Sequence, residues 1–212
     1  SQADRAELMS ELYAPEHANF NLCRLPIGAN DYAEDWYSLD ETAGDYALAH
    51  FSIERDKNCL IPYIKEAQAY QPEMKLFASP WSPPTWMKNP PVYNWGKLVW
   101  TPENLNAYAR YFARFVQAYA AEDVKIDQVH VQNEPVANQK FPSCMWTGEE
   151  LRVFIRDYIG PVLRKECPET ELWLGTINAP GCDFNHLIFD KWASEDYDYF
   201  ANIALSDEKA LQ

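Results

Sequence analysis

Residues 129–135 read Val-His-Val-Gln-Asn-Glu-Pro, which places a carboxyl group directly after a run of alternating residues. Such a run predicts a strand, so Glu134 would be held at the end of a rigid element. Partial burial there would raise the pKa of Glu134 toward the range of a useful general acid. Asn133 beside it can donate a hydrogen bond to a ligand hydroxyl group. A protonated carboxyl group that works with a second carboxylate is what hydrolysis of a glycosidic bond needs.

The elements that would position Glu134 alternate along the chain between strands and helices. Strands are predicted at residues 21–27, 75–78, 126–132 and 171–175, and helices at 3–13 and 58–70, from Thr101, from Thr147 and at 184–200. This alternation favours a parallel sheet with helices packed outside it.

Three of these helices carry clear local signals. Residues 3–13 place Leu8, Met9 and Leu12 on one face. Thr101 is a good N-cap and Pro102 suits the first helical position, where its missing N–H costs nothing. An apolar stripe then follows, made of Leu105, Tyr108, Phe112, Phe115 and Tyr119. Residues 147–150, Thr-Gly-Glu-Glu, form a capping box that predicts the next helix start.

Polar and aromatic residues gather just after the predicted strands. The groups are Asn30 and Asp31, Ser79 to Trp81, Asn133 and Glu134, and finally Asn178. In a (β/α)8 barrel the carboxyl ends of the strands form the face that carries the active site, and in an open α/β sheet they form the ligand face. We therefore expect these side chains to meet in one place.

The glycines help to choose between a barrel and a nucleotide-binding sheet. The chain has seven glycines and contains neither G-x-G-x-x-G nor G-x-x-x-x-G-K-[ST], so no phosphate-binding loop is indicated. Two long loops, at 28–57 and 79–100, suit a barrel with a deep cleft. The predicted fold class is therefore α/β, as part of a (β/α)8 TIM barrel.

The number of strands is too small for a closed barrel. Such a barrel needs eight strand–helix units and about 250 residues, whereas four units are found in 212 residues. A half-barrel would leave two open parallel edges, which favours aggregation. We therefore expect a fragment of a longer catalytic domain, or a chain that another part completes.

Three segments together resemble glycoside hydrolase family 30. They are Cys-Arg-Leu-Pro-Ile-Gly-Ala-Asn-Asp-Tyr at 23–32, Ser-Pro-Trp-Ser-Pro-Pro-Thr-Trp-Met-Lys at 79–88 and Asn-Glu-Pro at 133–135. The similarity extends along nearly the whole chain and includes Phe-Pro-Ser-Cys at 141–144. It implies strands 2–5 of the barrel, and the details look most like the glucosylceramidase and β-glucosidase branch. The family's first strand, last three strands and β-sandwich are not matched.

The resemblance also implies roles for individual residues. Glu134 would be the general acid/base and Asn133 would bind the 2-hydroxyl of the sugar. Asp31 would bind distal hydroxyls and Trp81 would stack on or bond to the same sugar. By their residue types alone, Asp31 could instead cap a loop, and Asn-Glu-Pro could be a surface turn.

Two further residues receive supporting roles by the same resemblance. Trp86, grouped with the substrate-binding residues, would shape the loop, and packing explains it better than contact with the sugar does. Arg24 would sit on the barrel floor and keep the nucleophile ionised, or simply pair with a structural carboxylate. The family's nucleophile is a Glu at the end of the seventh strand. No residue here matches it, so the isolated chain is expected to be inactive.

Composition narrows the choice of partners. The net charge of −14 argues against nucleic acid and anionic membranes, and no apolar run approaches the ~20 residues of a membrane helix. A carbohydrate substrate is compatible with this charge. The sequence predicts no cofactor and no metal, because its histidines show neither H-x-H nor H-E-x-x-H spacing. The five cysteines include no C-x-x-C, so buried free thiols are expected for most of them.

These observations predict a retaining β-glycoside hydrolase that acts on β-glucosides, with its nucleophile outside this chain. Alternatives within the family are a β-1,6-glucanase or a β-xylosidase. A non-catalytic carbohydrate-binding barrel, a metal-dependent hydrolase and a nucleotide-binding domain are less well supported. Family habit suggests a secreted or periplasmic protein, with a cytoplasmic one as the alternative.

Overall fold

A computed structural model describes residues 2–177, 200 and 202–211, and within this part the chain forms a four-stranded parallel sheet. The strand order is β1-β2-β5-β6. The strands are β1 (Leu22–Pro26), β2 (Lys75–Ser79), β5 (Gln128–His130) and β6 (Glu171–Trp173). Neighbouring strands are consecutive members of the parallel series and are joined by helical connections, which is the arrangement of a TIM barrel.

The two faces of the sheet differ in what they contact. The register sets Leu25 level with Ala78, and Ala78 level with Val129, and all three side chains are buried in the hydrophobic core. Side chains one position away point to the opposite face, because successive residues of a strand alternate. Arg24 and His130 lie on that opposite face, which in a closed barrel is the interior.

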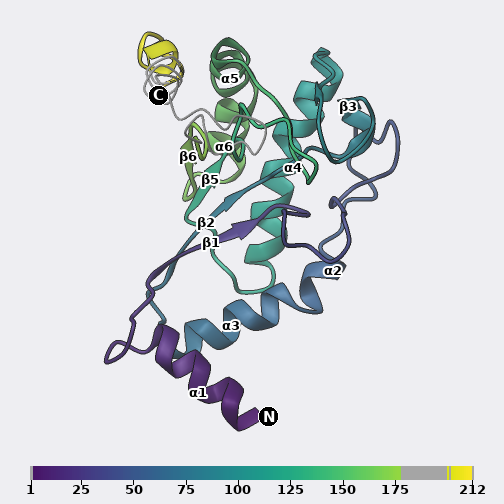
Figure 1. Cartoon of the computed structure of the whole chain (residues 1–212). Helices are drawn as coiled ribbons and strands as arrows, with labels where there is room; N and C mark the ends of the chain where they lie inside the picture. The colour runs from purple at the N-terminus through teal and green to yellow at the C-terminus, as the bar shows by residue number, and fades with distance from the viewer. Residues whose placement is uncertain (1, 178–199, 201, 212) are drawn as a thin grey trace, which may run out of the picture.

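The helices pack on the core side. They are α1 (Gln2–Tyr13), α2 (Glu54–Lys57), α3 (Leu60–Tyr70), α4 (Pro102–Ala120), α5 (Gly148–Phe154) and α6 (Gly160–Glu166), and a π-helical turn, η2 (Ile155–Ile159), joins the last two. Figure 1 shows α1 lying beside α3 at one end of the molecule, and α6 packs against α4. The stripe predicted on α4, from Leu105 to Tyr119, is buried, because this helix shares one hydrophobic core with the strands and packs against η2 and α6.

Local capping signals are confirmed. Thr101 is the N-cap of α4, and its side chain accepts a hydrogen bond from the backbone N–H of Asn104. Thr147 and Glu150 form the predicted capping box at the start of α5. These signals depend on residues within one turn of each other, so the sequence alone reports them.

Several predicted elements differ in extent. The helix expected at 58–70 begins at Leu60 and follows the short helix α2, and the strand expected at 126–132 is only Gln128–His130. Leu8 was expected on the buried face of its helix, but it is 56% exposed, whereas Met9 and Tyr13 of the same helix are buried and α1 packs mainly against α3. Leu22 is 58% exposed, because β1 is an edge strand of the described sheet. The helix expected at 184–200 lies outside the described residues except for Phe200.

The second long loop contains structure that the sequence did not predict. Residues Thr85–Met87 form a 3-10 turn, η1, and β3 (Lys88–Asn89) pairs with β4 (Lys97–Leu98) in an antiparallel hairpin. Gly96 has φ +73°, and a Cβ there would lie 2.4 Å from the carbonyl oxygen of Asn89. Glycine is therefore required where this hairpin turns back on itself.

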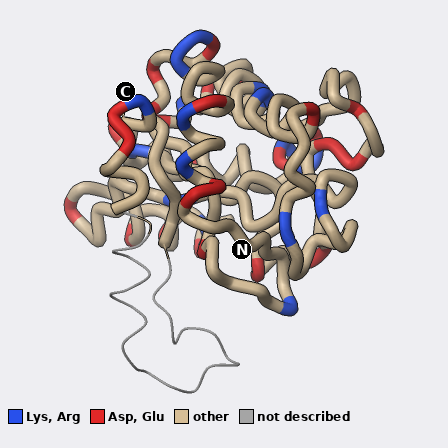
Figure 2. The backbone as a smooth tube through the Cα atoms, turned by 90° about the horizontal axis from the view of Figure 1, so that it is seen from above, with Lys and Arg blue, Asp and Glu red and all other residues tan. Residues whose placement is uncertain are grey.

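Charges and thiols are distributed without one dominant cluster in the described part. Figure 2 shows acidic and basic residues interspersed around the chain. Of the four cysteines described, all are free; Cys144 and Cys167 are buried as expected, whereas Cys23 is half-buried and Cys59 is exposed. Within the described ranges, no helix combines the length and the apolar character that a membrane crossing requires.

Candidate active site

A cavity of about 310 Å³ lies at the carboxyl ends of β1, β2 and β5. Its lining includes the residues that the sequence singled out from three separate strand ends: Arg24, Asp31, Trp81, Asn133 and Glu134. Asn30 and Tyr32 complete the wall formed by the first loop. The expectation that these side chains meet in one place is therefore confirmed by the geometry.

Arg24 connects three sides of this cavity. Its guanidinium donates hydrogen bonds to Ser79 Oγ at 2.7 Å and to Asn133 Oδ1 at 2.6 Å. It also lies over the Trp81 ring, with 4.3 Å between its Cζ atom and the ring centroid. Burial lowers the pKa of Arg24, while the nearby carboxylates of Glu134 and Asp31 oppose that shift. Arg24 therefore stays a cation and holds Asn133 and Trp81 in fixed orientations.

Gln132 fixes the loop after β2 against the loop after β5. Its buried side-chain amide donates to the carbonyl oxygens of Trp81 and Asn133, both at 2.8 Å. Its carbonyl accepts a hydrogen bond from the indole N–H of Trp146 at 3.1 Å. The Asn133 N–H also donates to the Pro80 carbonyl at 2.9 Å. Trp81 and Asn133 are therefore presented to the cavity by one connected set of hydrogen bonds.

Glu134 has an unusual backbone conformation. Its φ of +46° lies in the left-handed region, which a residue with a Cβ adopts only at a cost in free energy. The Glu134 N–H donates to the Thr176 carbonyl at 2.8 Å, and the Ala137 N–H donates back to the Glu134 carbonyl at 2.8 Å. The strand ends at His130, so strict alternation does not extend to Glu134.

The loop that carries Asp31 is fastened to helix α4. The Ala29 N–H donates to the Tyr37 carbonyl at 2.9 Å, and the Leu39 N–H donates to the Tyr111 hydroxyl at 2.9 Å. Farther along, the buried Asp56 accepts two hydrogen bonds of 2.7 Å from tyrosine hydroxyls, one from Tyr37 and one from Tyr119 of α4. The position of this long loop is therefore set by an outer helix.

Lys88 ties the second loop to the third. It is 3% exposed, and its ammonium group donates to Ser82 Oγ at 2.9 Å and to the carbonyls of Tyr93 and Ser143 at 2.8 and 2.7 Å. Burial lowers its pKa to about 8. Ser82 follows Trp81 directly, so this buried cation stabilises the backbone segment that carries Trp81.

Trp86 lies apart from these residues. Its indole N–H donates to the Asp40 carbonyl at 3.0 Å, and its ring packs edge-on against Tyr46 with 5.5 Å between centroids. Among the described residues that line the cavity Trp86 does not appear. Trp86, grouped by the sequence with the substrate-binding residues, therefore holds the first loop against the second outside the cavity lining.

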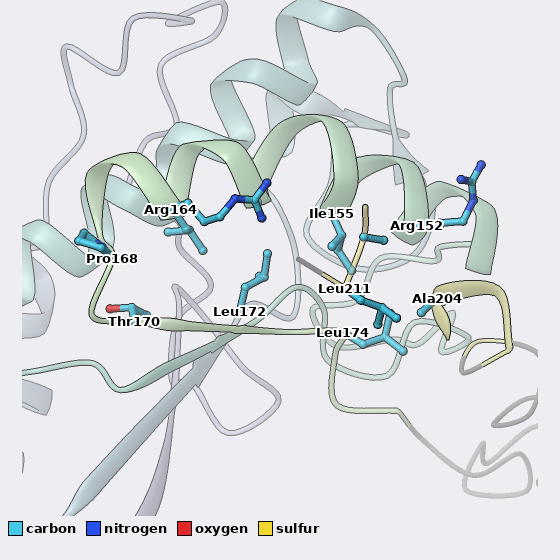
Figure 3. A pocket seen from close by; sticks show the side chains of 12 residues that line it. Arg152, Ile155, Arg164, Pro168, Thr170, Leu172, Leu174, Ala204 and Leu211 are labelled. Carbon is cyan, nitrogen blue, oxygen red and sulfur yellow. The ribbon is translucent and has the colours of Figure 1, made fainter. Parts of the chain in front are cut away.

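Two other cavities lie away from this chemistry. One of about 340 Å³ is enclosed between Ile155 and Arg164 of the helical layer and Leu172 and Leu174 of the β6 segment (Figure 3), and its lining contains no carboxylate. The other, of about 510 Å³, lies beside residues 123–126 and 166–170, at the amino ends of β5 and β6. In a barrel that end contributes to stability and not to catalysis. No group of three or more potential metal ligands occurs among the described residues.

Sequence reasoning did not identify Gln132 or Lys88 as residues that organise the site, and it named Ser79 only as one of the residues at a strand end. The burial of Gln132 and Lys88 was the signal available, because a polar residue inside an otherwise apolar segment needs a partner. That signal appears only after the fold is known. Asn178, expected near the site, lies outside the described residues.

Known proteins with the same architecture are similar to this chain over most of its length. Residues 1–197 match the model of the Glycosyl hydrolase family 30 TIM-barrel domain. The Endo-1,6-beta-D-glucanase of Neurospora crassa is 31% identical over 177 residues, which cover 81% of this chain and 37% of the relative. The Lysosomal acid glucosylceramidase of Mus musculus is 29% identical over 214 residues, which cover 97% of this chain and 39% of the relative.

A solved structure agrees with the sequence comparison. The crystal structure of SrfJ from Salmonella typhimurium superposes with a TM-score of 0.85 at 29% identity, over 99% of this chain and 44% of that one. The chain thus spans between a third and two fifths of the length of these two curated relatives and less than half of the solved chain.

Proposed function

Because this chain belongs to glycoside hydrolase family 30, we propose that it is the part of a retaining β-glycosidase that carries the general acid/base, Glu134. The observation that supports the proposal is the cavity in which Glu134 lies with Asp31, Trp81 and Asn133. A carboxyl group, an amide, a second carboxylate and a flat aromatic face are the groups that a sugar ring requires.

Each residue receives a role from its place in the cavity. Asn133 binds the 2-hydroxyl of the sugar, because Arg24 occupies its Oδ1 and leaves its N–H groups to donate. Asp31 accepts hydrogen bonds from distal hydroxyls. Trp81 contacts the apolar face of the ring, and Arg24 beneath it supplies positive charge that keeps a neighbouring carboxylate ionised.

The reaction proceeds in two steps. In the first, Glu134 gives its proton to the leaving oxygen while a second carboxylate attacks the anomeric carbon, and the bond to the aglycone breaks. In the second, Glu134 takes a proton from water, the water oxygen attacks the same carbon, and the second carboxylate leaves. Retention requires the two carboxyl groups to be about 5–5.5 Å apart. We place the second carboxylate outside this chain, so the 212 residues alone are expected to be inactive.

We propose a β-glucoside as the substrate, as for a glucosylceramidase or β-glucosidase. The second candidate is a β-1,6-glucan, which is favoured by the similarity to an endo-1,6-glucanase at 31% identity; a β-xyloside comes next. Product analysis after incubation of the complete protein with aryl β-glucoside, β-1,6-glucan and aryl β-xyloside separates the three. Binding of all three without release of sugar would instead indicate a non-catalytic carbohydrate-binding protein.

The role of Glu134 is tested with the variant Glu134→Gln in the complete protein. A positioned general acid contributes about 10²- to 10⁴-fold, so kcat/KM for methyl β-glucoside should fall by that factor. The value for dinitrophenyl β-glucoside should change little, because that leaving group needs no proton. Glu169→Gln, which alters an exposed carboxylate at the opposite end of the sheet, is the matched control. Equal losses for both substrates would reject the acid role.

A further inference from the structure

His130 is a buried imidazole whose orientation is fixed by two other rings. It is 9% exposed and lies between Phe77 of β2 and Trp173 of β6, with centroid distances of 5.0 and 5.4 Å. The His130 and Trp173 rings are nearly parallel, with 6° between their planes. Because the two partners belong to different strands, the imidazole cannot rotate without disturbing the sheet.

One edge of this fixed ring faces the residue that holds Glu134. The Nδ1 atom of His130 lies 3.5 Å from Thr176 Oγ1. Thr176 in turn accepts the Glu134 N–H on its carbonyl at 2.8 Å and donates its own N–H to the Gln132 carbonyl at 2.9 Å. The side chain of Thr176 thus contacts His130 while its backbone contacts both ends of the segment 132–134.

The conformation of Glu134 makes this contact important. A glutamate at φ +46° has no intrinsic preference for that conformation, so the surrounding contacts must impose it. The hydrogen bond to Thr176 is one of those contacts, and it lies on the residue's own N–H. A shift of Thr176 would therefore rotate the carboxyl group of Glu134 relative to the cavity.

Burial lowers the pKa of His130, a hydrogen bond to the backbone of Gly175 opposes that shift, and the positive charge of Arg24 adds to it. The ring is therefore neutral near pH 7, so it provides one N–H donor and one acceptor nitrogen. Nε2 is buried and has no hydrogen-bond partner among the described residues. The contact between His130 and Thr176 is therefore made through Nδ1.

We propose that His130 is a positioning residue for the reaction: through Thr176 it fixes the left-handed backbone of Glu134 and so aims the acid/base carboxyl group at the leaving oxygen. The inference rests on the proposed function of Glu134. If His130 acts in this way, its contribution to kcat/KM is specific to the step in which Glu134 transfers a proton. His130 and Thr176 also act as one unit, so that loss of either contact removes the same effect.

The test uses four variants of the complete protein and two substrates, methyl β-glucoside and dinitrophenyl β-glucoside. His130→Phe keeps a flat ring in the stack but removes both nitrogens, and Thr176→Val keeps the shape of Thr176 but removes its hydroxyl. Each should lower kcat/KM for the methyl glucoside by roughly 5- to 20-fold, which is the range expected for one lost hydrogen bond at a buried site. The dinitrophenyl substrate should change by less than about 3-fold.

The double variant and a conservative variant supply readouts that a purely structural role would not give. His130→Phe combined with Thr176→Val should lose no more than either single variant, because both remove the same contact. His130→Asn places an amide nitrogen near the position of Nδ1 and should recover most of the loss. If His130→Phe does not fold, Thr176→Val and His130→Asn still test the inference. For each of them, the loss of kcat/KM on the methyl glucoside is compared with the loss on the dinitrophenyl glucoside.

Three results would overturn the inference: equal losses for both substrates, no loss for the methyl glucoside, or losses that multiply in the double variant. Glu134→Gln in the same assay separates this failure from that of the proposed function. If Glu134→Gln shows no selective loss, the acid role itself is wrong. If it does and the His130 and Thr176 variants do not, only the positioning role is wrong.

Discussion

The guanidinium carbon of Arg24 lies 4.3 Å from the centre of the Trp81 ring, and the same guanidinium donates a hydrogen bond of 2.6 Å to Asn133 Oδ1. One cation therefore orients both an aromatic wall and an amide of the cavity. Its planar fork is needed for this, because an ammonium group cannot stack on the ring and donate in two directions with the same geometry.

Substitution of Arg24 by lysine keeps the charge but loses this geometry. Hydrogen bonds that involve a charged group contribute about 1.5–3 kcal/mol, which corresponds to a loss of roughly 10- to 100-fold in kcat/KM. We expect that loss for Arg24→Lys on an aryl β-glucoside. Arg5→Lys, which alters an exposed ion pair with Glu66, is the control and should leave the rate unchanged. A rate within 2-fold of the parent for Arg24→Lys, roughly 0.4 kcal/mol, would contradict the orienting role.

The backbone of Glu134 allows a separate test of strain. Glycine adopts a left-handed conformation without the penalty of a Cβ, which is about 1–2 kcal/mol. Glu134→Gly should therefore be more stable than Glu134→Ala by about 1 kcal/mol, although both lack the carboxyl group. Urea unfolding measures the difference.

The same pair of changes at Glu169 provides the comparison, since Glu169 is not among the residues with positive φ. There glycine should be no more stable than alanine. If the order of stability is the same at both positions, the left-handed conformation of Glu134 is not a source of strain.

Lys88 is expected to contribute to stability through its three buried acceptors. Lys88→Met fills a similar volume but leaves a hydroxyl and two carbonyl groups without their donor, at a cost of about 2 kcal/mol or more. Chemical unfolding should show this loss, and amide exchange should increase around Ser82, Tyr93 and Ser143. Lys97→Met, at an exposed position of β4, should change the unfolding free energy by less than about 0.5 kcal/mol. Similar effects of the two substitutions would show that the buried hydrogen bonds of Lys88 do not stabilise the fold.

Asp56 should make stability depend on pH. Burial raises the pKa of Asp56 above its ordinary value, while the tyrosine hydroxyls of Tyr119 and Tyr37 oppose the shift. The folded state then keeps its proton at pH values where the unfolded state has lost it. The contribution of Asp56 to stability is thus complete below about pH 4 and is lost as the pH rises through the higher, folded-state pKa.

Urea unfolding of the parent and of Asp56→Asn measures this effect. The measurements run from pH 4 to pH 7, a range that begins at the ordinary carboxyl pKa of about 4. The stability of the parent relative to the variant should fall as the pH rises. Asp35→Asn, whose side chain is 77% exposed, is the control and should give a constant difference. A parent that gains stability over Asp56→Asn toward pH 7 would show that the tyrosine hydrogen bonds outweigh burial.

The sequence predicted those parts of the site that follow from local signals and from one rule of topology. Caps at Thr101 and Thr147 depend on neighbours within a turn. The meeting of Asp31, Trp81 and Glu134 follows because parallel strands end at the same edge. The contact between His130 and Thr176 could not be predicted, because it depends on the register of β5 against β6 and on a change in backbone direction after His130.

Short and unusual elements could not be predicted from the sequence either. The strands β3 and β4 are two residues each, too short for a period of two to appear. The π-helical turn at Ile155–Ile159 continues the apolar spacing of the helix before it, so the change in hydrogen bonding leaves no mark on the pattern. The exposure of Leu8 depends on what packs beside α1, which a helical pattern alone does not specify.

Tyr111 and Tyr119 of α4 hold the first loop in place, although α4 contributes none of the described residues that line the cavity. A library designed to alter sugar preference by changing only cavity residues would therefore omit two positions that set the mobility of the wall carrying Asp31. Replacing either hydroxyl, as in Tyr111→Phe or Tyr119→Phe, offers a way to loosen that wall without altering any residue that lines the cavity.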